Sequence, residues 1–513
     1  MNLPKSLVEN LQKSWAEQFY QNIFLSIQED RFADLYSNIC SRPNKAVNML
    51  VSLLILKELH GLTDDELMGA LYFDYRYQYA MGISDFENDT FSINTLTNFR
   101  QRLMVYEAKE NIDLLKLETE ALSNKLADLI ALDRSMARMD SFMMSSSCKK
   151  LTRLELVFKV VQAMVKALHK LSPDLVPAVF QVYLQEQHQN EVLYHTKNTE
   201  AGSKLETQFA QAAELYRYVN QRPDWHQLDE YKRLNRLLND QCIESEEGDL
   251  IPIEAPKIAS DSLQNPTDPD ATYRNKGGEG HVGFVVNIVE VRDEEKQVGL
   301  ILSHEMDSNT HSDAEFGQSF VENDPLAKEI DSLSADGAYY RQETIQAAKE
   351  KGIEINLSNM TGRKVDKDAL PVNGFVQNDQ SIITHCPAGH KAVSAKYDSE
   401  KKVYTAKFDK TICAVCPFQE QCPMNEQKKY NTVRFTESKL QSDTFRSSMN
   451  SDRHKELSRF RAGVEGVVSA LRRKFGVDDL PIRGFLRSKI WLNAKIVAYN
   501  FKMIIKYQAK LAQ

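Results

Sequence analysis

The feature that most constrains the fold is a long helical stretch between two segments with strand character. Residues 131–147 (ALDRSMARMDSFMMSSS) predict a strand, whereas residues 151–239 follow helical periodicity, as in LELVFKVVQAMVKALHKL. The next apolar runs are GFVVNIVEV and VGLILSHEM, joined by the charged turn RDEEKQ, which is typical of a β-hairpin. About a hundred residues are too many for a loop inside a compact domain. We therefore expect a helical insertion in an α/β domain.

The segments that follow the hairpin alternate between helix and strand. AEFGQSFVEN favours a helix, SLSADGAYY begins as a strand, RQETIQAAKEKG favours a helix and IEINLS a strand. This order predicts a mixed α/β sheet flanked by helices. The chain closes with two helical runs, RHKELSRFRAGVEGVVSALRRKFG and SKIWLNAKIVAYNFKMIIKYQ.

The region from Asn44 to Leu103 predicts a small all-α module. Thr63 precedes three acidic residues and is suited to cap a helix. In TFSINTLTNFRQRL, Ser92 or Asn94 would cap a helix that we expect to end in Arg100, Gln101 and Arg102. A helix-turn-helix that binds a phosphate backbone and a structural three-helix bundle both fit this pattern.

Three acidic residues stand where a two-metal phosphodiester site would need them. Such a site uses carboxylates on rigid elements to hold two divalent cations about 3.5–4 Å apart. Asp140 lies in the strand-like run, Asp336 ends the strand of SLSADG, and Glu465 lies on a predicted helix. Asp336 also suits a turn or a helix N-cap. We expect Glu465 to be buried within or beside the apolar stripe of its helix.

The first of these acids has alternatives. Asp261, Asp268 and Asp270 precede the hairpin and would supply the first-strand acid if the helical run were not an insertion. We favour Asp140, because RMDSFMM favours a strand whereas NPTDPDA favours a turn.

The charge is unevenly distributed. The whole chain carries −8, but residues 428–513 hold 19 Lys and Arg against 7 Asp and Glu, a balance of +12, which leaves −20 on the first 427 residues. A polyanion responds to the local field, so a nucleic-acid partner fits this chain, as does a solvated Lys-rich helical face. We find no apolar run of about 18 residues and no signal peptide, and we therefore expect a cytoplasmic protein outside the membrane.

Four cysteines are grouped between the second and third acids. Cys413, Cys416 and Cys422 form C-x2-C-x5-C, with Cys386 upstream in HCPAGH. Four thiolates in this pattern favour a structural Zn²⁺ site with a scaffold or DNA-contact role, with His385 or His390 as a substitute ligand; buried unliganded thiols are the alternative.

These segments together resemble the DDE transposases of bacterial insertion sequences. The resemblance covers nearly the whole chain, from RPNKAVNMLVSLLILKELHGLTDDEL through ARMDSFMMSSSCKKLTRLELVF and SADGAYY to RAGVEGVVSALRRKFG and the closing NFKM. It implies an RNase H-like catalytic domain with Asp140, Asp336 and Glu465 as the acidic triad, binding Mg²⁺ or Mn²⁺. The family's signature around the Glu has Tyr, Arg, Glu and Lys; Arg461 and Glu465 match it, whereas Ser458 replaces the Tyr and Arg472 the Lys.

The resemblance implies binding of insertion-sequence ends, metal-dependent cleavage by water and attack of the freed 3′-hydroxyl on target DNA. The partners would be double-stranded DNA and a second copy of the chain, in the bacterial nucleoid. A metal-dependent nuclease without strand transfer and an inactive, transposase-derived DNA-binding protein are alternatives. The candidate DNA-binding residues are Asn94, Arg100, Arg102, Arg461, Arg472, Arg473 and Lys474. The expected domains are an N-terminal helical domain (1–125) and a discontinuous RNase H-like domain (126–513), with a helical insertion (148–250) and a Cys-rich insertion (380–430).

Overall fold

The computed structural model describes residues 4–36, 45–83, 91–194, 200–245, 249–359, 369–449, 451–478 and 480–512. The chain forms two compact units. Unit 1 comprises Met1–Arg134, Ser141–Ser312 and Gly466–Gln513, and unit 2 comprises Ser135–Asp140 and Asp313–Glu465. Strand β1 (Met136–Ser145) contributes residues to both units. Within the described residues, no helix has the length and apolar character needed to cross a membrane.

Unit 1 begins with helices, as expected. Thr63 forms a capping box with Glu66, and Ser92 rather than Asn94 is the N-cap of helix α6. The expectation that this helix ends near Arg102 is wrong, because α6 continues for two more turns on Leu103 and Glu107, which are buried. The helices are α1 (Lys5–Gln12), α2 (Trp15–Asn22), α3 (Val47–His60), α4 (Asp64–Phe73), α5 (Tyr75–Ala80), α6 (Ile93–Glu110) and α7 (Leu114–Leu129).

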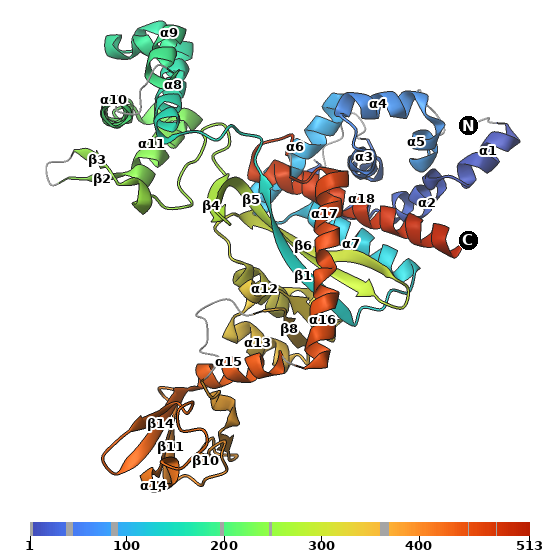
Figure 1. The fold of residues 1–513 in the computed structure, drawn as a ribbon. Helices are drawn as coiled ribbons and strands as arrows, with labels where there is room; N and C mark the ends of the chain where they lie inside the picture. The colour runs from blue at the N-terminus through green and yellow to red at the C-terminus, as the bar shows by residue number, and fades with distance from the viewer. Residues whose placement is uncertain are drawn as a thin grey trace. The chain divides into compact units, whose positions relative to one another are not determined.

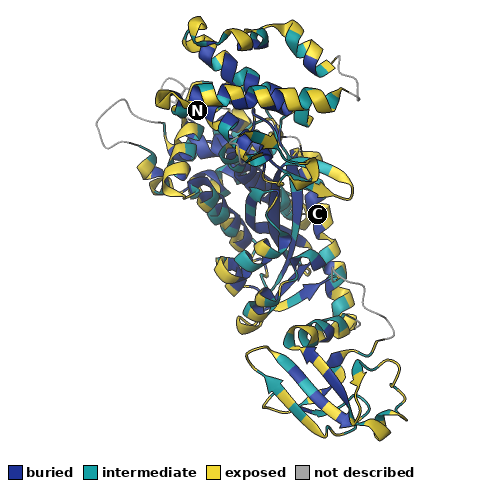
Figure 2. Ribbon diagram, turned by 90° about the vertical axis from the view of Figure 1, so that its left-hand side faces the viewer, coloured by how far each residue is buried: buried dark blue, intermediate teal, exposed yellow. Residues whose placement is uncertain are grey.

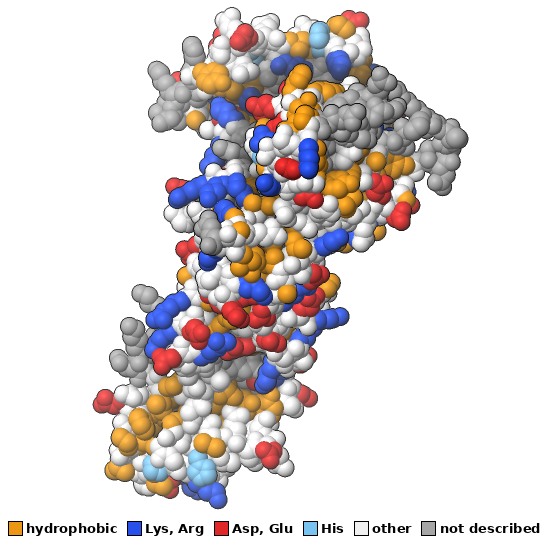
Figure 3. Space-filling model, turned by 90° about the vertical axis from the view of Figure 1, so that its right-hand side faces the viewer, with side chains coloured by type: hydrophobic (Ala, Val, Ile, Leu, Met, Phe, Trp, Pro, Cys, Tyr) orange, Lys and Arg blue, Asp and Glu red, His pale blue; other side chains and the backbone are white. Residues whose placement is uncertain are grey.

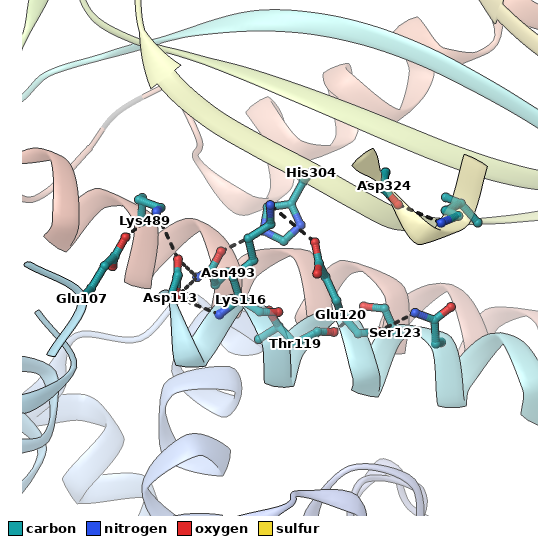
Figure 4. A network of polar contacts seen from close by, with 12 residues as sticks. Glu107, Asp113, Lys116, Thr119, Glu120, Ser123, His304, Asp324, Lys489 and Asn493 are labelled. Carbon is teal, nitrogen blue, oxygen red and sulfur yellow. Dashed lines mark hydrogen bonds and ion pairs between the residues drawn. The ribbon is translucent and has the colours of Figure 1, made fainter. Parts of the chain in front are cut away.

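The last helix, α18 (Phe485–Leu511), packs against α3, α7 and strand β6 (Val298–Ser308). Helix α3 is buried over most of its circumference, which explains why its sequence is apolar almost throughout. The interface of α18 also contains polar contacts. The Asn500 side chain accepts a hydrogen bond from Ile301 N at 2.9 Å and donates one to Ile301 O at 2.7 Å. In Figure 4, Lys489 reaches Glu107 and Asp113, and Asn493 contacts Asp113 and His304.

The segment in which the sequence predicts a helical insertion is largely helical. Helices α8 (Arg153–Leu171), α9 (Glu186–Gln189), α10 (Ala201–Asn220) and α11 (Asp229–Gln241) group together in Figure 1. They enclose their own apolar core, to which Phe158, Tyr183 and Phe209 contribute. The short strands β2 (Cys242–Glu244) and β3 (Leu250–Pro252) pair after α11.

The fold is mixed α/β, as predicted, with parallel and antiparallel pairing. In unit 1, β4 (Thr272–Lys276), β5 (Glu279–Asp293) and β6 are antiparallel, and β5–β6 is the predicted hairpin. Gly283 of β5 has φ of +156°, and a Cβ there would lie 2.1 Å from the carbonyl oxygen of Met144 in β1. In unit 2, β1 pairs in parallel with β7 (Ser332–Ala335), and β7 pairs in parallel with β8 (Glu354–Leu357). Helices α12 (Asp313–Asn323) and α13 (Gln342–Glu350) alternate with these strands.

The cysteine-bearing segment of unit 2 folds largely as β structure. Strands β11 (Ser394–Asp398), β12 (Val403–Asp409), β14 (Tyr430–Thr436) and β13 (Met424–Glu426) form an antiparallel sheet in that order, and β9 (Val376–Gln377) pairs with β10 (Ile383–His385). A small core includes Phe375, Tyr404 and Phe435, and Figure 2 shows these strands with only a narrow buried strip. We name residues 372–436 the Cys-bearing subdomain. The remaining α-helices of the described residues are α14 (Lys410–Cys413), α15 (Glu437–Ser448), α16 (Asp452–Ala462) and α17 (Val464–Phe475).

Candidate active site

Three acids predicted from the sequence lie together in unit 2. Asp140 is on β1, Asp336 directly follows β7, and Glu465 is the second residue of α17. The strand register explains why the first two meet. Arg138 of β1 pairs with Ser334 of β7 in a parallel ladder, and Asp140 and Asp336 each stand two residues further along. Both carboxylates therefore lie at the same level of the two neighbouring strands, Asp140 within β1 and Asp336 directly after the end of β7.

The Arg461 side chain contacts all three carboxylates. Its Nη2 lies 3.0 Å from Oδ1 of Asp140 and 3.9 Å from Oδ2 of Asp336, and its Nη1 lies 3.3 Å from Oε1 of Glu465. Because Asp140 and Asp336 share one nitrogen, these two oxygens are at most 6.9 Å apart, the sum of the two distances. We name Asp140, Asp336 and Glu465, with Arg461 among them, the acidic site.

The side chains of the acidic site differ in how far they are exposed to solvent. The side chains of Arg461 and Asp140 are 13% and 15% exposed, that of Asp336 is 34% exposed, and that of Glu465 is 68% exposed. The expectation that Glu465 is buried is wrong. Val464, Val467, Val468 and Leu471 form the buried stripe of α17, and Glu465 lies beside it, facing outward. Opposite charges, rather than burial, therefore account for its position beside Arg461.

Asp336 has the N-cap role that the sequence also allowed. Its Oδ1 accepts a hydrogen bond from Ala338 N at 2.8 Å and caps a short 3-10 helix (Gly337–Tyr339), while Oδ2 faces Arg461. A Cβ on Gly337 would lie 2.4 Å from the carbonyl oxygen of Asn359, so glycine permits this close approach. The cap fixes one carboxylate oxygen and aims the other at the site.

Sequence reasoning missed the residues that hold Arg461 in place. Arg138, two residues before Asp140 on the same face of β1, is buried and donates a hydrogen bond from Nη1 to the Phe460 carbonyl at 2.7 Å. A Cβ on Gly463 would lie 2.1 Å from that same Nη1. The sequence signal was an Arg in a Met-rich strand, two positions before an Asp.

A second anchor fastens the start of α16. The His454 Nε2 lies 2.8 Å from the Leu357 carbonyl at the end of β8. Ser458, which stands where the resemblance expects Tyr, lies 3.5 Å from Nδ1 of His454 through its hydroxyl. The Ser hydroxyl therefore supports a neighbour on its own helix.

The acidic site has suitable donors for a hard divalent cation. Carboxylate oxygens are the ligands that Mg²⁺ and Mn²⁺ prefer, and a positive group already lies among them. In the conformation described here, no group of three or more His, Cys, Asp or Glu side chains among the described residues is arranged to hold a metal ion.

The alternative first acids lie elsewhere, in unit 1. Asp268 is buried and accepts a hydrogen bond from the Ser146 hydroxyl, and burial raises its pKa. Asp270 accepts a hydrogen bond from Phe485 N at 2.9 Å, at the first residue of α18. Asp261 is exposed.

The predicted DNA-binding residues of the N-terminal region differ in their surroundings. Arg100 forms two hydrogen bonds with Asp64, at 2.7 and 2.9 Å, and this pairing lowers the pKa of Asp64 to about 2. Arg102 lies over the Tyr36 ring at 4.6 Å, and Asn94 is exposed. The charge of Arg100 is thus already matched within the protein.

The predicted basic DNA-binding residues of α17 lie in the last turn of that helix. Arg472, Arg473 and Lys474 are all exposed, and Arg472 pairs with Asp478 at 3.0 Å. On the face drawn in Figure 3, Lys and Arg side chains occur in several groups, with Asp and Glu between them.

The four grouped cysteines meet in the Cys-bearing subdomain. Cys386, Cys413 and Cys422 pack against its small core. Burial, and then the neighbouring thiols of Cys413, Cys386 and Cys416, raise the pKa of Cys422 to about 11. The thiols are close enough to influence one another, but the described residues do not arrange them as a group that could hold a metal ion. Cys148 and Cys242 lie in unit 1.

Two protein-family models match the chain. Residues 385–505 match the model described as "Transposase DDE domain", and residues 10–102 match "Transposase domain (DUF772)". The first range contains Arg461, Glu465 and the four grouped cysteines, and the second contains Asp64 and Arg100. No curated protein and no solved structure matched the chain.

Proposed function

We propose that this chain, which its two family matches identify as a DDE transposase of insertion-sequence type, binds insertion-sequence ends, cuts them in a metal-dependent reaction and joins them to target DNA. The observation that carries the proposal is the convergence of Asp140, Asp336 and Glu465 on one guanidinium from three separate elements. Most acidic side chains of a protein are solvated, and three on rigid elements around one cation form a preorganised binding site.

Asp140, Asp336 and Glu465 would hold Mg²⁺ or Mn²⁺ in this proposal. When bound, such ions polarise the phosphodiester and lower the pKa of water. The chain's own residues orient the site. The cap at Ala338 N aims Asp336 inward, and the bond from Arg138 to the Phe460 carbonyl holds the end of α16, from which Arg461 projects. Arg461 would also bind a DNA phosphate, for which its planar fork of donors is suited.

An RNase H-like catalytic domain fits the arrangement of the strands. The parallel strands β1, β7 and β8 and the antiparallel strands β4, β5 and β6 supply a mixed sheet, with the helical insertion between β1 and β4. We propose the division predicted from the sequence: an N-terminal helical domain at 1–125, catalytic residues within 126–513, and insertions at 148–250 and 380–430. The packing of α18 on α3 and α7 supports a close association of the N-terminal helical domain with the catalytic domain.

DNA contacts are proposed for the exposed basic ends of α17 and for α6. Arg472, Arg473 and Lys474 are solvent-accessible and suited to phosphates, as is Arg102, while Asn94 is exposed for base or backbone contact. Arg100 would contribute only after leaving Asp64. Two ends must be brought together for transposition, so we propose that the active form is a homodimer on double-stranded DNA.

We also propose that Cys386, Cys413, Cys416 and Cys422 bind a structural Zn²⁺. The support is their grouping in a subdomain with a small core, where a metal would add the stability that apolar burial does not supply. This role is scaffolding and supplies no chemistry to the acidic site.

The test is cleavage and joining of a duplex that carries the element's terminal repeats, in Mg²⁺ or Mn²⁺. We expect Asp140→Asn, Asp336→Asn and Glu465→Gln each to lower the cleavage rate at least about a hundredfold with DNA binding retained. Glu456→Gln is the matched control, because Glu456 is an exposed carboxylate on α16 that pairs with Arg453.

The products separate the three functions. Cleavage followed by joining supports a transposase, and cleavage without joining supports a nuclease. Binding of the ends without cleavage by the parent protein supports an inactive DNA-binding protein. Parent-like cleavage by the three acid variants would refute the assignment of the acidic site.

A further inference from the structure

The Arg461 guanidinium occupies the position of a cation. One positive group is shared by three carboxylates, at 3.0, 3.9 and 3.3 Å. The acidic site therefore has two excess negative charges with Arg461 in place and three without it. Like charges repel one another, most strongly at the less exposed Asp140, so a counter-ion stabilises the carboxylates near one another.

The guanidinium is held mainly by these acids. Its Nη1 and Nη2 face the carboxylates, while its Nε is buried and has no hydrogen-bond partner among the described residues. A buried donor without a partner destabilises the arrangement that holds it. The backbone near Arg461 is anchored by Arg138, but the guanidinium itself is bound through the oxygens that a metal would need.

We propose that Arg461 is the internal counter-ion of the metal-free site, and that metal binding displaces it and frees it for a DNA phosphate. The inference rests on the proposed function and adds an order of events: the metal takes the carboxylates, and Arg461 then becomes available to the nucleic acid. The two cations compete for the same oxygens and repel each other, so both cannot keep the contacts described here.

The first test measures metal binding without catalysis. Titration with Mn²⁺, followed by the electron paramagnetic resonance signal of the free ion, gives a Kd for the DNA-free protein. We expect Arg461→Ala to tighten this Kd at least about fivefold, because a competing charge is removed. Arg461→Lys retains the charge and should stay within about twofold of the parent.

Arg453→Ala is the matched control. Arg453 lies on the same helix, is exposed, and pairs with Glu354 and Glu456 away from the acidic site, so its removal should leave the Mn²⁺ Kd unchanged. Circular dichroism melting of each variant establishes that it is folded. A Kd that is unchanged or weaker in folded Arg461→Ala would overturn the inference.

The second test asks where Arg461 goes. The metal is Ca²⁺, which also prefers oxygen ligands. DNA binding is measured by the fluorescence anisotropy of a labelled 30-base-pair duplex. We expect Ca²⁺ to strengthen DNA binding by the parent at least about threefold and by Arg461→Ala less than half as much, with a salt dependence shallower by about one phosphate contact. An equal Ca²⁺-dependent gain in both proteins would overturn the second step.

Failure of the proposed function gives a different result. If Asp140→Asn and Glu465→Gln bind Mn²⁺ as tightly as the parent, the acidic site is not the metal site. If those two variants lose Mn²⁺ binding while Arg461→Ala binds it like the parent, the metal site stands and the counter-ion role of Arg461 is refuted.

Discussion

Arg461 and Asp140 lie 3.0 Å apart, from Nη2 to Oδ1, although 321 residues separate them in the sequence. The long gap contains the helical insertion, the hairpin, strands β7 and β8, and the Cys-bearing subdomain. The parallel pairing of β1 with β7 and the anchoring of α16 by Arg138 bring the two ends of this gap together.

Gly463 and Gly466 offer a matched pair of glycine substitutions. A Cβ on Gly463 would displace the Arg138 guanidinium from the Phe460 carbonyl, so we expect Gly463→Ala to lower the free energy of unfolding by about 1–3 kcal/mol. A Cβ on Gly466 meets nothing within 4 Å, so Gly466→Ala in α17 should raise it by about 0.5–1 kcal/mol. Urea denaturation measures both. Equal effects of the two substitutions would contradict the close packing at Gly463.

His304 should make stability depend on pH. Burial lowers the pKa of His304 to about 4, while its Nε2 lies 2.7 Å from Oδ1 of Asn493. In the unfolded chain, a His takes up a proton near pH 6.5. The contribution of His304 to the free energy of unfolding is therefore fully present above about pH 6.5 and is lost as the pH falls toward 4. His304→Gln should reduce the slope of the free energy of unfolding against pH in that window, by the amount that corresponds to about one proton taken up on unfolding. An unchanged slope in denaturant melts at pH 4.5, 5.5 and 6.5 would count against this prediction.

Asp64 should make the free energy of unfolding decrease at acidic pH. Hydrogen bonds from Arg100 lower the pKa of Asp64 to about 2, so its contribution is present above about pH 4 and is lost as the pH falls toward 2. Its side chain is 27% exposed, which reduces the expected loss in Asp64→Asn to about 1–2 kcal/mol at pH 7. Asp65→Asn, in the same first turn of α4 and exposed, should cost less than half as much. Equal losses would argue against the Arg100 pairing.

Zinc content tests the thiol proposal. We expect the purified protein to hold about one zinc per chain by mass spectrometry of the metal, and Cys416→Ser to lose it together with stability of the Cys-bearing subdomain. Cys148→Ser, outside the group of four, should keep the zinc. A metal-free parent protein prepared without chelators would refute the zinc site.

Much of the local structure was predictable because it depends on neighbours in the sequence. Two apolar runs around a charged turn predicted the hairpin β5–β6, and helical periodicity predicted the helices of the segment after β1. The capping box at Thr63 needs only a residue three positions away. The end of α6 was not predictable, since tertiary burial of Leu103 and Glu107 prolongs the helix.

The sequence by itself determined the chemistry available to the protein: acids in a strand, after a strand and on a helix, a basic C-terminal segment and four grouped thiols. Only the tertiary structure decided which of them meet. Asp140, rather than Asp261, Asp268 or Asp270, lies beside Asp336, because the register of two parallel strands depends on hydrogen bonds between segments nearly 200 residues apart. The tertiary structure also decided the position of Arg461 among the carboxylates. That position depends on the buried Arg138, which binds the Phe460 carbonyl, and Gly463 leaves the space that the Arg138 side chain occupies.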